Sequence, residues 1–215
     1  MEVSSQGDKP YLQYLLMTPK EIKLKKLVIA SGNPGKIEEF EAYFAGLDYS
    51  LLPKPDEIEV EETGTTFIEN AHLKASQVAI ATQQWALADD SGLEVLALDG
   101  APGVLSARYG TSDLDRIARL LAELGDRTER QAQFVCAIAV AAPDGTIAID
   151  AIGVCKGEIL YAPIGDRGFG YDPIFYVPEY KLTFGQMSPQ LKGEISHRAK
   201  AIEILRPQLK KLAIA

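Results

Sequence analysis

Apolar and polar positions alternate along the chain in two different patterns, and together these predict strands interleaved with helices. Leu27–Ala30 is an uninterrupted apolar run with the length of a buried strand. Phe40 and Phe44 follow at helical spacing among polar neighbours. Asn33 suits the cap of that helix and Pro34 suits its first position. We therefore predict a strand, a tight loop and a helix at the start of the folded region.

Capping signals predict the next two helices. Thr66 and Glu69 have the spacing of a capping box, so a helix is predicted over residues 67–81. Another helix is expected to begin after Ser112, with leucines and an isoleucine on its inner side, and to stop at Gly125.

The second half of the chain begins with a predicted hairpin. Residues 133–141 and 146–155 are β-rich and flank the turn residues Pro143–Gly145. A last helix is predicted after Ser196, with apolar positions as far as Leu212 facing inward. Strands alternating with helices, followed by a hairpin, predict an α/β or α+β fold with a mixed sheet.

The stretch Ala88–Gly92 is the centre of the candidate chemistry. The apolar run Trp85–Leu87 predicts a strand that ends by delivering Asp89 and Asp90 to the edge of a cleft, and residues 93–98 are also strand-like. In an extended segment these two carboxylates point to opposite faces, so one of them would hold a cation or activate a water. The same five residues also suit an ordinary turn, and by themselves they do not decide between the two interpretations.

Composition narrows the class of protein. The 215 residues suffice for one domain or a domain of two lobes, and the net charge of -8 argues against a general nucleic-acid binder. Cys136 and Cys155 lie in apolar runs without metal-ligand spacing, which favours free thiols in a reducing compartment. No apolar run has the length of a membrane span and the N-terminus lacks a signal-peptide pattern, so we expect a cytoplasmic protein without a membrane partner. Residues 1–25 are predicted to be a disordered or loosely attached extension.

The loop Ser31–Lys36 has the features of an anion site. A helix start presents unpaired N–H groups and the positive end of the helix dipole, and Lys36 adds a full charge. The loop differs from a Walker A motif, because Ala30 and Ile37 occupy positions where that motif needs glycine and Ser or Thr. A plain strand-to-helix turn remains the alternative.

Other segments supply groups that complement this loop. Lys74 is a second cation for a polyphosphate, and Glu62 joins Asp90 as a hard oxygen ligand suited to Mg²⁺. Phe169 lies between glycines, which lets a flat ligand approach while the ring stacks on it. Each of these residues also has an ordinary structural or solvated interpretation. A nucleoside triphosphate is the ligand that requires all of them, with donors and an acceptor for its base at Asp172, His197 and Arg198.

At this point the chain resembles the inosine triphosphate pyrophosphatase family, also called XTP/dITP diphosphatases, over about residues 27–212. The resemblance rests on six motifs in order: Ser31–Lys36, Glu62–Lys74, Ala88–Gly92, Gly100–Gly103 with Ser106–Tyr109, Gly168–Pro173 and Ser196–Arg198. Ser31 stands where many relatives have Thr, and residues 1–25 have no counterpart.

The resemblance implies a function and a two-lobed domain over residues 26–215, a long mixed sheet flanked by helices with a central substrate cleft. Family members hydrolyse inosine, deoxyinosine and xanthosine triphosphates to the monophosphate and pyrophosphate, use Mg²⁺ and act as cytoplasmic homodimers. By matching position, Asp90 is implied as the catalytic carboxylate and, with Glu62, as a metal ligand. The implied substrate-binding residues are Ser31, Gly32, Asn33, Pro34, Gly35, Lys36, Lys74, Ser91, Phe169, Gly170, Tyr171, Asp172, Lys192, His197 and Arg198.

Two rival functions stay open at this stage. One is a related enzyme that acts on other damaged nucleotides, such as modified pyrimidine triphosphates. Measuring pyrophosphate release from a panel of substrates distinguishes the two enzymes. The other is a nucleotide sensor without turnover, against which the set of Lys36, Glu62 and Asp90 argues, because a sensor needs no water activator.

Overall fold

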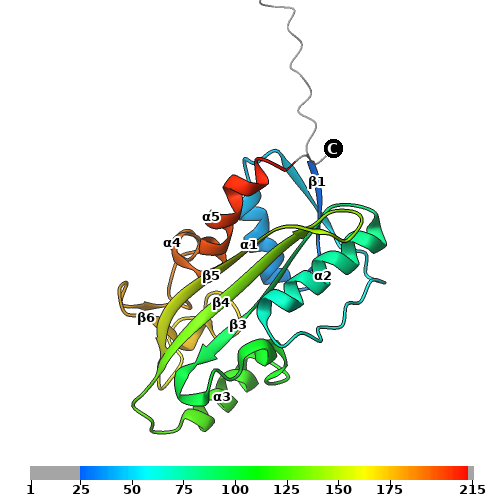
Figure 1. Cartoon of the computed structure of the whole chain (residues 1–215). Coiled ribbons are helices and arrows are strands. Elements are labelled where there is room, and N and C mark those ends of the chain that lie inside the picture. Colours follow the sequence, from blue (N-terminus) through cyan, green and yellow to red (C-terminus); the bar gives the residue numbers. More distant parts are fainter. Residues whose placement is uncertain (1–24, 213–215) are drawn as a thin grey trace, which may run out of the picture.

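The computed structural model describes residues 25–212, and the predicted extension therefore lies almost entirely outside the described part. Its centre is a seven-stranded mixed sheet in the order β2-β1-β3-β4-β5-β6-β7 (Figure 1). Strands β1, β2 and β3 are parallel, and each later neighbour is antiparallel. The strands are β1 (Lys25–Ile29), β2 (Tyr49–Pro53), β3 (Ala86–Val95), β4 (Gln131–Ala141), β5 (Ile147–Ile159), β6 (Phe175–Val177) and β7 (Leu182–Thr183).

Helices cover both faces of the long central strands. They are α1 (Pro34–Phe44), α2 (Phe67–Thr82), α3 (Asp113–Leu124), α4 (Pro189–Ile195) and α5 (His197–Leu209). Alanines of α2 pack on alternate alanines of β3 and β4, while phenylalanines of α1 and leucines of α5 pack on the other face. Figure 1 shows α2 on one side of the sheet and α1 with α5 on the other. The predicted α/β fold with a long mixed sheet and flanking helices is confirmed.

A third cluster of buried side chains is separate from the two faces of the sheet described above. It is formed by α3, the last residues of β3 and the short strands β6 and β7, and it contains Phe134, Phe175 and Phe184. Short 3₁₀ turns, η2 (Leu96–Leu98), η3 (Gly103–Arg108) and η4 (Asp172–Ile174), connect these elements. No helix within residues 25–212 combines the length and apolarity needed to span a bilayer.

Most predicted elements are found where the sequence placed them. Asn33 caps α1, Thr66 and Glu69 form the capping box of α2, and Ser112 caps α3. The predicted hairpin is β4 and β5.

Several element boundaries were predicted wrongly. The strand predicted to end at Asp89 and Asp90 continues to Val95, because β4 pairs with it residue by residue through Gly92. The last helix, α5, ends at Leu209 rather than reaching Leu212.

Candidate active site

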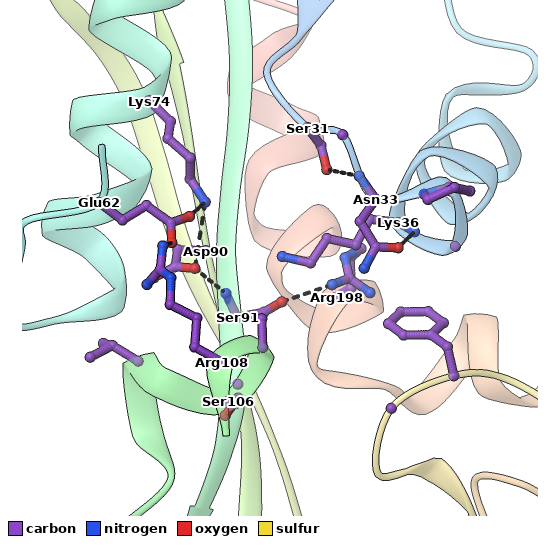
Figure 2. Close-up of a pocket in the computed structure, with 18 of the residues that line it drawn as sticks. Ser31, Asn33, Lys36, Glu62, Lys74, Asp90, Ser91, Ser106, Arg108 and Arg198 are labelled. Carbon is purple, nitrogen blue, oxygen red and sulfur yellow. Dashed lines mark hydrogen bonds and ion pairs between the residues drawn. The ribbon is translucent and has the colours of Figure 1, made fainter. Parts of the chain in front are cut away.

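A cleft of about 710 Å³ lies between the carboxyl ends of the parallel strands and the segment that follows β5. Every residue predicted for the site lines this cleft, including Lys36, Asp90 and Phe169, which come from distant parts of the sequence. Figure 2 shows Glu62, Lys74 and Arg108 on one side, Ser31, Asn33, Lys36 and Arg198 on the other, and Asp90 with Ser91 between them.

The start of α1 is held in the shape of an anion site. The side chain of Asn33 accepts a hydrogen bond from Lys36 N at 3.2 Å, and Asn33 N donates to Ser31 Oγ at 3.2 Å. Gly35 lies against Phe169, and a Cβ there would meet the ring at 2.6 Å. The helix start and the aromatic loop are therefore in direct contact, and residues Ser31 to Lys36 line the cleft, where the positive end of the helix dipole and the Lys36 ammonium favour an anion.

Asp90 and Glu62 converge on one cation. Lys74 Nζ lies 2.5 Å from Glu62 Oε1 and 3.5 Å from Asp90 Oδ1, and Asn70 Nδ2 donates to Asp90 Oδ2 at 3.0 Å. Burial raises the pKa of Asp90 in spite of the opposing charges of Lys74 and Lys36. Burial also acts on Glu62, but its hydrogen bond and ion pair with Lys74 outweigh it and lower the pKa of that carboxyl.

These two carboxylates fit a Mg²⁺ ion that also binds substrate. Both already face a common positive charge, and protein sites for Mg²⁺ commonly use one or two carboxylates, with phosphate oxygens and water completing the shell. Residues 25–212 hold no group of three or more His, Cys, Asp or Glu side chains arranged for a metal. The donor set therefore suits an ion shared with a triphosphate better than a permanently caged one.

Asp89 points to the other face of β3, as predicted, and begins a chain of buried ion pairs. Its Oδ2 lies 3.0 Å from Lys36 Nζ and 3.1 Å from Arg198 Nη2. Arg198 also pairs with Glu39, which pairs with Lys192 at 2.9 Å. Burial alone would raise the pKa of Asp89, but Lys36 and Arg198 outweigh it and hold that pKa far below the usual range.

This chain of ion pairs reaches the residues predicted for the base. Lys192 Nζ lies 2.6 Å from Asp172 Oδ2 and 4.7 Å from the centre of the Phe169 ring. Asp172 Oδ2 also accepts a hydrogen bond from Phe169 N at 2.9 Å, which fixes the loop that carries the ring. Burial nevertheless raises the pKa of Asp172, because the opposing effect of Lys192 is smaller.

His197 and Arg198 bring unpaired polar atoms to the same region. His197 is buried and stacks on Phe134 with centroids 4.7 Å apart, and burial followed by the charge of Arg198 lowers its pKa well below the ordinary value. Within the described residues, His197 Nδ1 and Arg198 Nε are buried without a hydrogen-bond partner. Buried polar atoms without partners are rare, so this wall of the cleft is suited to a polar ligand.

Tyr171 and Gly170 line the cleft but use their polar groups to hold its wall. The Tyr171 hydroxyl donates to Ser106 O at 3.0 Å, and Gly170 N donates to Asp113 Oδ2 at 2.7 Å. The sequence analysis missed Glu39. It assigned no final site role to Asn70, Asp89 and Arg108, although each lies in one of the six motifs. All four pair with a predicted site residue. Glu39 follows Lys36 at i+3, a spacing that places both near one helix face and was available as a signal.

Comparison with known proteins gives one consistent relationship. The Ham1 family matches residues 27–208. The chain is similar to the dITP/XTP pyrophosphatases of Nostoc sp., with 60% identity over 86% of this chain and 94% of that protein, and of Synechocystis sp., with 58% identity over 83% and 92%. It is also similar to the solved structure of a HAM1 protein from Coxiella burnetii, at 40% identity and a TM-score of 0.81, over 88% of this chain and 100% of that one.

Proposed function

The chain belongs to the Ham1 family, and from this membership and the cleft we infer that it is a nucleoside triphosphate pyrophosphatase. It hydrolyses deaminated purine nucleoside triphosphates, namely inosine, deoxyinosine and xanthosine triphosphates, to the monophosphate and pyrophosphate. The observation that carries this function is the meeting of Lys36, Asp90 and Phe169 in one cleft. Lys36 binds the phosphates, Asp90 acts at the attacked phosphorus, and Phe169 stacks on the base.

The reaction follows from the placement of these groups. Asp90, with Asn70 holding one of its oxygens, orients a water and takes its proton as the water attacks the α phosphorus. The bond between that phosphorus and the bridging oxygen breaks, and its electron pair leaves with the pyrophosphate. Lys36 and Lys74 neutralise charge on the phosphates, so most of the acceleration comes from positioning and electrostatics.

We propose Mg²⁺ as the cofactor, held by Glu62 and Asp90. When bound, the ion would neutralise negative charge on the phosphate oxygens. We also propose that the protein acts in the cytoplasm as a homodimer, as the family resemblance implies. Sedimentation equilibrium tests the homodimer directly.

Recognition of the base is proposed to depend on the wall that contains His197, Arg198 and Asp172. Hypoxanthine and xanthine carry an oxo group where adenine carries an amine. A donor from His197 or Arg198 would form a hydrogen bond with the oxo group and would stay unpaired opposite the amine. A site that hydrogen-bonds one group rejects a replacement strongly, because its buried donors lose their partners.

The test is pyrophosphate release from inosine, xanthosine, guanosine, adenosine and a modified pyrimidine triphosphate, with and without Mg²⁺. Release is expected from the first two and to depend on the ion. Asp90→Asn is expected to lower the turnover number by about 10²-fold or more, because it removes the proton acceptor. Preferential release from the pyrimidine would favour the rival substrate class, and tight binding of inosine triphosphate without turnover would favour a sensor.

A further inference from the structure

The segment Ser106–Tyr109 forms part of the cleft wall, and the roles described above make no use of its cation. Arg108 Nη2 lies 2.5 Å from Glu62 Oε2, and 54% of the Arg108 side chain is exposed. Figure 2 shows Arg108 extending from η3 toward Glu62 and Asp90 on the side of the cleft occupied by Lys74. Its guanidinium therefore lies next to the groups assigned to the phosphates and the ion.

The backbone beneath Arg108 is firmly held. Ser106 Oγ donates to Gly103 O at 2.6 Å and accepts from Leu93 N at 2.9 Å, while Ser106 O accepts from the Tyr171 hydroxyl at 3.0 Å. These bonds fix η3 to β3 and to the loop that carries Phe169. Arg108 is thus a long, partly exposed side chain on a fixed support, which can change its partner without a change in the fold.

Cations of the cleft must exchange carboxylate partners for phosphate oxygens when a triphosphate enters. Lys74 and Arg108 both pair with Glu62, and Lys36 pairs with Asp89. A polyanion can therefore recruit these cations only by competing with carboxylates. Arg198 is poorly suited to such an exchange, because it is almost fully buried and held by two carboxylates and the Ser91 hydroxyl. The Arg108 side chain is largely exposed, and Glu62 keeps Lys74 as a partner when Arg108 leaves, so Arg108 can leave Glu62 at low cost.

We propose that Arg108 leaves Glu62 to bind the terminal phosphates of the substrate, and that it stabilises the pyrophosphate as it departs. This inference rests on the proposed function and assigns a residue to the leaving-group end of the same site. A guanidinium presents paired N–H donors that match phosphate oxygens. The bonding electrons pass to the bridging oxygen as the α phosphorus–oxygen bond breaks. Arg108 stabilises the negative charge that develops on the departing pyrophosphate.

The position of Arg108 predicts an effect on the binding of one product only, which a general loss of structure would not produce. Arg198, one of the residues assigned to the base, lies on the side of the cleft opposite Arg108 (Figure 2). Removing the charge of Arg108 should therefore weaken binding of pyrophosphate and spare binding of inosine monophosphate. A residue that only supported the shape of the cleft would affect both products.

The experiment compares Arg108→Gln and Arg108→Lys with Arg119→Gln as a matched control. Arg119 is equally exposed at 52%, pairs with one carboxylate, Glu123, at 2.9 Å, and packs over the Tyr109 ring next to η3, yet it does not line the cleft. Turnover and KM are measured with inosine triphosphate, and binding of inorganic pyrophosphate and of inosine monophosphate is measured by calorimetry, each with and without Mg²⁺.

Arg108→Gln is expected to lower turnover by about 10- to 10²-fold and to weaken pyrophosphate binding by about tenfold, with binding of the monophosphate unchanged. Arg108→Lys should lie between this variant and the wild type, and Arg119→Gln should resemble the wild type. Unchanged pyrophosphate binding in Arg108→Gln, or equal weakening of both products, would overturn the proposal. A wild-type protein that releases no pyrophosphate from any triphosphate would instead refute the proposed function, while the calorimetric comparison would still report on Arg108.

Discussion

Asp89 and Asp90 are adjacent in the chain, yet their surroundings shift their pKa values in opposite directions. Burial raises the pKa of Asp90, whereas Lys36 and Arg198 overcome burial and lower the pKa of Asp89. The raised pKa makes Asp90 a stronger base than an ordinary aspartate, which suits the proposed activation of water. The lowered pKa makes Asp89 a permanent negative charge that organises the cations around it.

The ionised Asp89 is expected to stabilise the fold over a defined pH range. Its pKa is lower in the folded state than the value of about 3.9 in an unfolded chain, so the stabilisation is present above about pH 4 and is lost as the pH falls toward the folded pKa. Asp89→Asn leaves Lys36 and Arg198 without this counter-charge and is expected to lower the free energy of unfolding at pH 7 by about 3–5 kcal/mol.

Urea unfolding of Asp89→Asn and the wild type between pH 7 and pH 3 measures this effect, and the difference between the two should shrink below about pH 4. Asp150→Asn is the matched control, because Asp150 forms an exposed pair with His72 and its loss should cost only about 0–1 kcal/mol. A difference that stays constant across this pH range would argue that Asp89 acts through packing rather than charge.

At the scale of elements, β3 explains both the success and the failure of the sequence analysis. The pattern correctly placed Asp89 and Asp90 on opposite faces of an extended segment. It also led to a predicted strand end at Asp89 and Asp90, because a glycine that follows polar residues usually marks a turn. In the structure Gly92 is an internal strand residue whose missing side chain leaves room for η3, a long-range contact that no local pattern reports.

This close approach predicts a specific defect in Gly92→Ala. A Cβ there would lie 2.5 Å from both Gly103 O and Ser106 Oγ, so η3 must move away from β3. The expected loss is about 1–3 kcal/mol in the free energy of unfolding, the usual cost of overpacking. Turnover should also fall, since η3 carries Arg108 and lines the same cleft as Asp90.

Unfolding by urea and pyrophosphate release measure the two consequences. Gly193→Ala, in α4, is the stability control, because a Cβ there meets no atom within 4 Å in the described part of the chain. It should leave stability unchanged or raise it by up to about 1 kcal/mol, as expected for alanine replacing glycine in a helix. Equal stability of the Gly92 and Gly193 variants would contradict this account of β3.

At the scale of the whole molecule, the sequence predicted which residues meet but not how they pair. Local signals such as caps and glycine-flanked aromatics, together with the family resemblance, identified the cleft residues. Partners such as Glu39 for Arg198 and Arg108 for Glu62 are separated by 159 and 46 positions. Such pairs depend on the packing of whole helices on the sheet, and a single sequence contains no periodic pattern that would reveal them.

The pairing of cations in the cleft also bears on how a nucleotide arrives. Lys36, Lys74 and Arg198 all have carboxylate partners, and the protein as a whole carries a net charge of -8. An incoming polyanion therefore meets weak long-range repulsion instead of an attractive field, and its attraction begins only within contact distance. Because salt screens charges beyond about 10 Å at 0.1 M, stopped-flow association rates should rise slightly or stay level as salt is added, whereas a steep fall would reveal an electrostatic funnel.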